Sequence, residues 1–260
     1  MPFTISHAAA VLPLRKLNNS RLPLAALMIG SMAPDFGYFL PVSMSRSSTH
    51  DLDGLFLFCW PVGLAVWLLF VHVLERPTIE LLPAPWRERV AHSDTSVTLK
   101  ALALASIGIL IGALTHIAWD AFTHRNTAVV EAFPLLRAEL FEYRGRTLRL
   151  FVLLQYLSSV VGLLALAWWG WNLRNAPRVE TAHKRNFLTD RARLGAVVVV
   201  LITSGATALL SFAESAGDRF EHRMFHLLIG GMTGWLLAWC VVAVIVTQVA
   251  QRAAVTTAKR

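Results

Sequence analysis

Five long apolar runs restrict the fold of this chain more than any other feature. They cover residues 54–74, 99–120, 148–173, 194–213 and 223–250. A helix needs about 20 consecutive apolar residues to cross a bilayer, and inside lipid only a helix or a closed barrel satisfies its own backbone. Charged side chains make up 15% of the 260 residues, whereas soluble domains carry about 25%. We therefore predict an all-α integral membrane helical bundle with about five transmembrane helices.

The N-terminal region is apolar but interrupted. Prolines and a glycine break residues 22–40, and the uninterrupted part, 24–33, is too short for a span. We predict an interfacial or re-entrant helix there. The whole chain, 1–260, is then one membrane domain. Its N-terminal interfacial segment covers 1–53, its transmembrane bundle covers 54–250, and its polar tail covers 251–260.

Two regions are expected to be irregular. Pro61 lies inside the first span and predicts a kink, which neighbouring helices tolerate in a membrane protein. Residues 125–147 carry mixed Arg and Glu and predict a loop with a short helix.

Charge and cysteine content narrow the function classes. The formal net charge of +8 suggests nucleic acid in a soluble protein, but here basic residues flank membrane spans and set topology. We therefore expect membrane lipid as a partner, and no nucleic acid. Cys59 and Cys240 both lie inside apolar runs, which indicates neither a disulfide framework nor a cysteine zinc site.

The end of the second span carries the most informative motif. His116, Asp120 and His124 follow one another at four-residue intervals, so they share one face of a helix. Two imidazoles around a carboxylate suit zinc or a similar divalent ion. The alternative is a capped helix end with a hydrogen-bonded His–Asp pair.

Alternating spans bring further candidates to the same side of the membrane. Ionisable groups in spans are costly and usually functional, so we predict a divalent metal site, with one or two zinc ions or manganese. The predicted ligands are His7, Asp35, His50, His116, Asp120, His124 and His226. For His226 the alternative is a hydrogen bond to another helix.

The sidedness of this site follows from the basic residues. The densest cluster, between residues 174 and 193, falls on the opposite side from the predicted ligands. Positive-inside reasoning puts that cluster in the cytoplasm, so the site would face outward. Arg125, Arg144 and Arg146 could clamp an anionic substrate there, or be ordinary loop charges.

Three motifs together resemble a known family. They are MPFTISHAAAVLPL at the start, IGSMAPDF at 29–36 and GALTHIAWDAFTH at 112–124. This pattern resembles a bacterial family of uncharacterised membrane proteins, a domain of unknown function of the DUF4184 type. The resemblance implies a multi-pass protein of the bacterial inner membrane and no established activity.

The order His, Pro-Asp, His, His-x3-Asp, His also resembles, more distantly, membrane-bound metal-dependent hydrolases, zinc-dependent phospholipase C and single-strand nucleases. That likeness implies one metal at Asp35, His50, His116 and Asp120. It also implies that His124 helps to hold a second, with Asp120 bridging, and that His7 lies near a third. The later His-x3-Glu of those enzymes is here His222-x3-His226, so one or two ions fit better than three.

These features lead to a functional hypothesis with rivals. The hypothesis is metal-dependent hydrolysis of a phosphate ester in a lipid or amphiphilic substrate, with Asp35 or Asp120 orienting or deprotonating a water. The first rival is a non-enzymatic membrane protein, or a pseudoenzyme, with a structural metal or a hydrogen-bonded cluster. The second is a transporter, although neither repeats nor midplane carboxylates are visible. The oligomeric state stays open.

Overall fold

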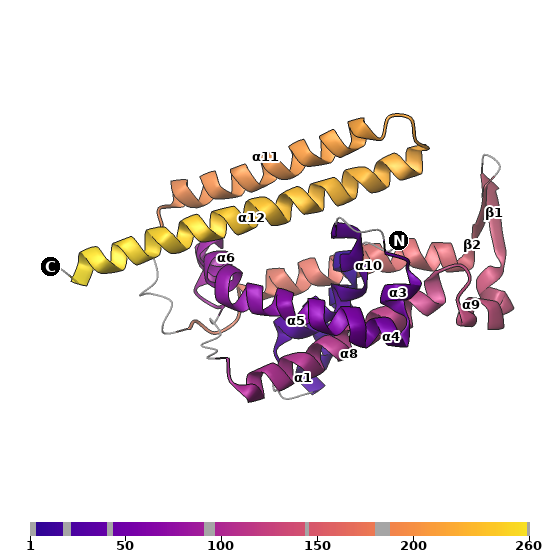
Figure 1. Ribbon diagram of the computed structural model, residues 1–260, viewed down its shortest axis with the longest axis horizontal. Helices are drawn as coiled ribbons and strands as arrows, with labels where there is room; N and C mark the ends of the chain where they lie inside the picture. Colours follow the sequence, from indigo (N-terminus) through magenta and orange to yellow (C-terminus); the bar gives the residue numbers. More distant parts are fainter. Residues whose placement is uncertain are drawn as a thin grey trace. The chain divides into compact units, whose positions relative to one another are not determined.

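The computed structural model describes residues 4–17, 22–40, 44–90, 97–143, 146–179 and 188–258. Figure 1 shows an almost wholly helical chain with one short β-hairpin. The elements in chain order are η1 (Thr4–Val11), α1 (Leu12–Leu17), α2 (Leu24–Met32), η2 (Ala33–Phe39), α3 (Ser47–His50), α4 (Leu52–Gly54), η3 (Leu55–Cys59), α5 (Trp60–Leu69), η4 (Phe70–Leu74), α6 (Glu75–Leu81), α7 (Ala84–Arg87), α8 (Leu99–Thr123), α9 (Ala128–Ala132), η5 (Pro134–Arg137), β1 (Glu139–Tyr143), β2 (Arg146–Arg149), α10 (Leu150–Leu173), α11 (Asp190–Glu214) and α12 (Phe220–Ala258).

Five helical segments in the described part of the chain are long and apolar enough to cross a membrane. They are Leu52–Leu81, Leu99–Ala132, Leu150–Leu173, Asp190–Glu214 and His222–Gln251, and a shorter apolar helix covers Thr4–Leu14. The predicted fold class is confirmed: this is a helical, multi-pass membrane protein whose spans contact lipid.

The irregularity predicted at Pro61 takes a specific form. Two π-helical segments, η3 and η4, flank α5, and η3 ends two residues before Pro61. A proline has no N–H, and its ring crowds the carbonyl four residues earlier. A wider π turn relieves that crowding, so the first span continues past the proline.

The predicted loop at 125–147 is wrong in part. The short helix is present as α9, but β1 and β2 then form an antiparallel hairpin. An amphipathic strand shows itself by alternating apolar and polar residues. Here Leu140 and Phe141 are neighbours and both exposed, so no alternation marks the strand.

The chain divides into two compact units, each described here by itself. The first is Met1–Trp67 with Thr95–Trp171, and the second is Leu68–Asp94 with Asn172–Arg260. The single membrane domain over 1–260 stays a prediction.

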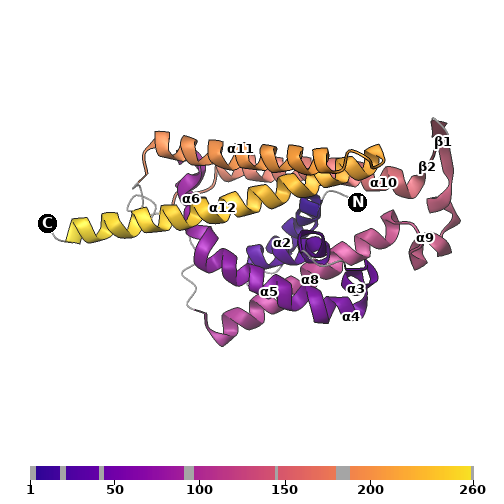
Figure 2. The same ribbon diagram turned by 45° about the horizontal axis from the view of Figure 1, so that its top comes forward.

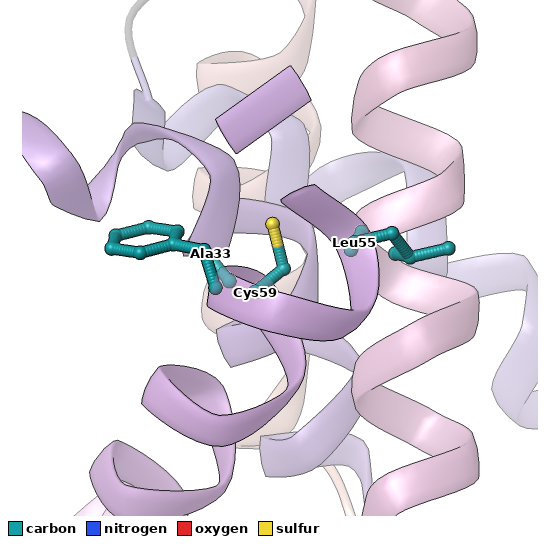
Figure 3. Packing of buried hydrophobic residues seen from close by; sticks show 5 residues of the cluster. Ala33, Leu55 and Cys59 are labelled. Atoms are coloured by element: carbon teal, nitrogen blue, oxygen red, sulfur yellow. The ribbon is translucent and has the colours of Figure 1, made fainter. Parts of the chain in front are cut away.

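The first unit is organised by the packing of α2 on α8. A Cβ added at Gly112 would collide with backbone atoms of Leu27 and Ser31, and one added at Gly30 would collide with the backbone of Ile109. The two helices therefore touch backbone to backbone at these glycines. Beside this contact lies a buried cluster of Ala33, Leu55, Phe58, Cys59 and Ala113 (Figure 3).

The second unit is built on a helical hairpin. In Figures 1 and 2, α11 and α12 run side by side as an antiparallel pair. Small residues form the contact: a Cβ at Gly234 would collide with the side chain of Thr207, and Ser204 Oγ donates to the carbonyl of Gly231 at 2.8 Å. Such small-residue contacts are typical of helix pairs in membranes.

The close contact of α2 and α8 yields a stability prediction. Gly112→Ala should lower the free energy of unfolding in detergent by roughly 1–3 kcal/mol, because the new methyl group meets backbone atoms that cannot rotate away. The control is Gly170→Ala on α10, where a Cβ meets nothing within 4 Å. Thermal unfolding should show a loss for the first variant and none for the second. An equal loss of stability in both variants would contradict the backbone contact between α2 and α8.

Candidate metal centre

His116 and Asp120 lie near the C-terminal end of α8 and are both buried. His116 Nε2 is 3.4 Å from Asp120 Oδ2. The other ring nitrogen, Nδ1, donates to the carbonyl of Ser31 on α2 at 2.8 Å. This bond places a ring proton on Nδ1 and leaves Nε2 facing Asp120. Such a bond to the remote nitrogen is typical of metal-binding histidines.

Asp35 reaches the same point from η2. Its side chain is buried, and Oδ2 accepts a hydrogen bond from Thr4 Oγ1 at 2.8 Å. Oδ1 lies 3.6 Å from His50 Nε2 and 3.8 Å from His116 Nε2. Burial alone would raise the pKa of Asp35, but His50, His116 and Thr4 outweigh burial and hold that pKa below its usual value. Asp35 is therefore a carboxylate at neutral pH.

His50 ends α3, and a second close turn holds it. A Cβ at Gly54 would lie 2.7 Å from the carbonyl of Ser48, so α3 and α4 can meet only at a glycine. His50 Nδ1 hydrogen-bonds Thr49 Oγ1 at 2.8 Å, and Cys59 Sγ–H donates to the carbonyl of Thr49 at 3.2 Å. The apolar cluster of Figure 3 thus supports the segment that presents His50.

His7, on η1, completes the inner part of the site. Its ring stacks on that of His116 with centroids 3.8 Å apart, and its Nε2 lies 3.7 Å from Asp120 Oδ1. Burial, with a contribution from neighbouring His116, lowers the pKa of His7 to about 4. The imidazole is therefore neutral at pH 7, and neutral imidazole is the form that binds metals.

His124 lies at the rim, at the C-cap of α8. Its Nδ1 is 3.4 Å from Asp120 Oδ1 and 3.2 Å from Thr123 Oγ1. Its Nε2 is 3.4 Å from the side-chain amide of Gln155 on α10. Gln155 thus links α10 to the end of α8 and orients this histidine.

Arg46 is the functional candidate that sequence reasoning missed. Its Nη2 lies 2.6 Å from Asp120 Oδ2, and its side chain is 35% exposed. It precedes α3 in a serine-rich segment with no periodicity, so nothing in the sequence points to it. The guanidinium brings a positive charge to the open side of the cluster.

Buried atoms of this cluster lack hydrogen-bond partners. They are His7 Nε2, His50 Nε2, His116 Nε2 and Asp120 Oδ1. Buried polar atoms are normally hydrogen-bonded, and leaving one unpaired costs roughly 1–3 kcal/mol. Three of these atoms are imidazole nitrogens and the fourth is a carboxylate oxygen. A cation bound among them could satisfy all four.

The spacing of the donor atoms suits a divalent ion. His7, His116 and Asp120 form one group able to hold a metal, and Asp35, His50 and His116 form another. Nitrogen or oxygen ligands at about 2.1 Å from a tetrahedral zinc lie about 3.4 Å from one another. The close His–Asp contacts of the cluster join nitrogen and oxygen atoms 3.4 to 3.8 Å apart, and the donor atoms of each group all lie within 4.8 Å of one another. The buried His and Asp side chains could therefore hold a metal ion.

The other predicted site residues lie elsewhere or outside the described part. His226 belongs to the second unit and is exposed, and its Nε2 lies 4.0 Å from Asp218 Oδ2. Arg125 is exposed just after α8, Arg146 is the first residue of β2, and Arg144 lies outside the described residues. Their roles stay predictions.

Comparison with known proteins gives the family. The model described as "Domain of unknown function (DUF4184)" matches residues 1–247. The chain belongs to this family. The match confirms the resemblance expected from the three motifs, and it spans every residue of the cluster. No curated protein and no solved structure matches the chain.

Metal content tests the cluster directly. Purified protein should carry a metal ion in stoichiometric amount, and His116→Gln and Asp120→Asn should each lose it, because each removes a donor atom at the centre of the cluster. Both replacements keep size and polarity, so the fold should survive. His72→Gln, at an exposed histidine of η4, should keep the metal. Elemental analysis of the variants checks this, and equal metal in all of them would refute the site.

Proposed function

We propose that this protein is a membrane-bound, metal-dependent hydrolase of phosphate esters, acting on a lipid or another amphiphilic substrate. The observation that carries the proposal is the set of buried, unpaired donor atoms around Asp120. His116 and Asp120 belong to a membrane span, and the order of the residues in the set resembles that of zinc-dependent phospholipase C.

The donors divide into two sets that share Asp120. Asp35 Oδ1, His50 Nε2, His116 Nε2 and Asp120 Oδ2 would hold one ion, and each imidazole nitrogen lies 3.4 to 3.8 Å from the two carboxylate oxygens. His116 offers only its Nε2, because its other nitrogen is bonded to Ser31. His7 belongs with His116 and Asp120 to the other group of donors, which would hold a second ion, with His124 close to Asp120 Oδ1 to help hold it. Nitrogen and oxygen donors without sulfur suit zinc and also admit manganese.

The number of donors bears on catalysis. Structural zinc sites are closed by four protein ligands, and catalytic sites keep a position open for water. The second set offers three donors, and it lies beside partly exposed His124. An open position at that place favours a catalytic site over a structural one.

The residues of the cluster suit the hydrolysis of a phosphate ester by water. When bound, a divalent ion supplies Lewis acidity, which makes water nucleophilic at neutral pH and offsets charge on phosphoryl oxygens. We assign the role of orienting or deprotonating the attacking water to Asp120, which borders the open position, with Asp35 as the alternative base. The water oxygen bonds to phosphorus, the ester P–O bond breaks, and the alcohol leaves with a proton from solvent.

Arg46 would bind the phosphate. It is partly exposed and lies against Asp120, so an anion approaching the open side meets a guanidinium. Arginine matches phosphate oxygens with two parallel hydrogen bonds. We keep Arg125, Arg144 and Arg146, from the stretch 125–147, as proposed substrate contacts.

We also propose that the site faces the extracytoplasmic side of the bacterial inner membrane. Gln155, which contacts His124, and the basic stretch that begins at Arg174 lie at opposite ends of α10. Nineteen helical residues rise about 28 Å, close to the hydrocarbon thickness of a bilayer. Positive-inside reasoning assigns the basic end to the cytoplasm.

Activity on phosphate esters tests the function. Zinc-loaded protein in mixed micelles should release product from phospholipid or from an aryl phosphodiester, and a chelator should abolish this until zinc or manganese is restored. Arg46→Gln should lower kcat/KM roughly 100-fold, since it removes a donor to the developing charge, with metal content unchanged. Arg178→Gln, in the second unit, is the control. Inactivity of metal-replete wild type toward both substrates would refute the hydrolase.

Cysteine labelling tests the orientation. Glu142→Cys on β1 and Arg191→Cys on α11 both place a thiol at an exposed position. A membrane-impermeant maleimide applied to spheroplasts should label Glu142→Cys at once. Arg191→Cys should react only after the membrane is permeabilised. The reverse pattern would put the cluster on the cytoplasmic side.

A further inference from the structure

A groove opens beside the cluster in the first unit. It has a volume of about 470 Å³ and lies between η1, α8 and α10. Its walls are mostly apolar and include Ala9, Ala10, Trp119 and Leu157, and His7 lines it as well. Pockets for small ligands have volumes of about 300–1,000 Å³, so the groove is of ligand size.

The groove runs lengthwise along a membrane span. Leu154, Leu157, Val161 and Ala165 line it at spacings of three, four and four residues, which is one face of a helix. Eleven residues of helix rise about 16 Å. Because α10 is one of the candidate spans, an occupant would lie parallel to the hydrocarbon chains of the bilayer.

Small residues create the groove. A Cβ at Gly162 would lie 2.7 Å from the carbonyl of Ser6, so η1 contacts α10 there. On either side of this contact, Ala9, Ala10 and Ala165 present only methyl groups. Larger side chains at these positions would fill the space.

The groove and the cluster share His7. His7 lines the groove and also lies 3.7 Å from Asp120 Oδ1. Arg46 contacts the other oxygen of Asp120. A molecule with an apolar chain in the groove would therefore bring its head to the donor atoms and to a positive charge.

From this juxtaposition we infer that the groove binds one acyl chain of a membrane phospholipid whose phosphate lies at the His–Asp cluster. The inference rests on the proposed function and names its substrate as a lipid that enters sideways from the bilayer. An acyl chain needs no hydrogen bonds. An extended peptide would leave backbone groups unpaired against these apolar walls, which is costly.

Photo-crosslinking tests the occupant. The full chain is placed in phosphatidylcholine vesicles that contain a few per cent of phosphatidic acid with a diazirine on its acyl chain. After illumination, peptide mapping should find adducts concentrated on residues 154–165 and on η1. Val161→Trp should lower the adduct yield at these positions at least fivefold, because the indole fills the groove.

The matched control is Leu164→Trp, at a position on α10 that is 65% exposed and is not among the residues that line the groove. It should leave the adduct yield unchanged, and both variants should keep wild-type metal content. Adducts spread evenly over all spans and insensitive to Val161→Trp would overturn the inference, because they would report surrounding lipid only.

This readout is separate from hydrolysis. Metal-free, inactive protein that still yields Val161-sensitive adducts would support the groove while the proposed function fails. Metal-loaded, active protein without such adducts would refute the groove alone.

Discussion

The backbone contact between α2 and α8 is the constraint on which the candidate site depends. Gly30 and Gly112 bring the two helices close enough for the Ser31 carbonyl to accept the Nδ1 proton of His116. Because η2 follows α2 directly in the chain, the same close approach brings Asp35 opposite His116. Bulkier residues at Gly30 and Gly112 would push the two helices apart, and this would separate the donor atoms of Asp35 from those of His116.

Charge balance explains how two buried carboxylates can lie so close together. Asp35 and Asp120 are both 2% exposed, and an isolated buried carboxylate is expensive. Thr4 donates to Asp35, and Arg46 lies against Asp120. Buried His7 adds a ring that is neutral at pH 7. Ring nitrogens of His7, His50 and His116 and one oxygen of Asp120 stay without hydrogen-bond partners, and a cation could satisfy them.

Much of this molecule could be predicted from the sequence. Long apolar runs have one physical interpretation, and the five spans are confirmed. The four-residue spacing of His116, Asp120 and His124 placed them on one helical face, and alternation of spans brought His7, Asp35 and His50 to the same side. The ligand roles of these six residues stay predictions, although the structure brings their side chains together.

The remainder depends on tertiary contacts that leave no local pattern. Arg46 matters only because the segment before α3 folds back on Asp120. The sequence of the β-hairpin shows no alternation of apolar and polar residues, because the neighbouring side chains of Leu140 and Phe141 are both exposed. His226 was grouped with the ligands by topology alone, and it lies in the other unit.

The distribution of the cluster along the chain has a consequence for biogenesis. Residues 7, 35 and 50 are synthesised first, yet α2 gains its partner only when α8 enters the membrane, more than 60 residues after α2 ends. Until then, these polar side chains lack the groups that bury and orient them. The cluster is therefore complete only after the second span is inserted, and the Gln155 contact to His124 waits for the third.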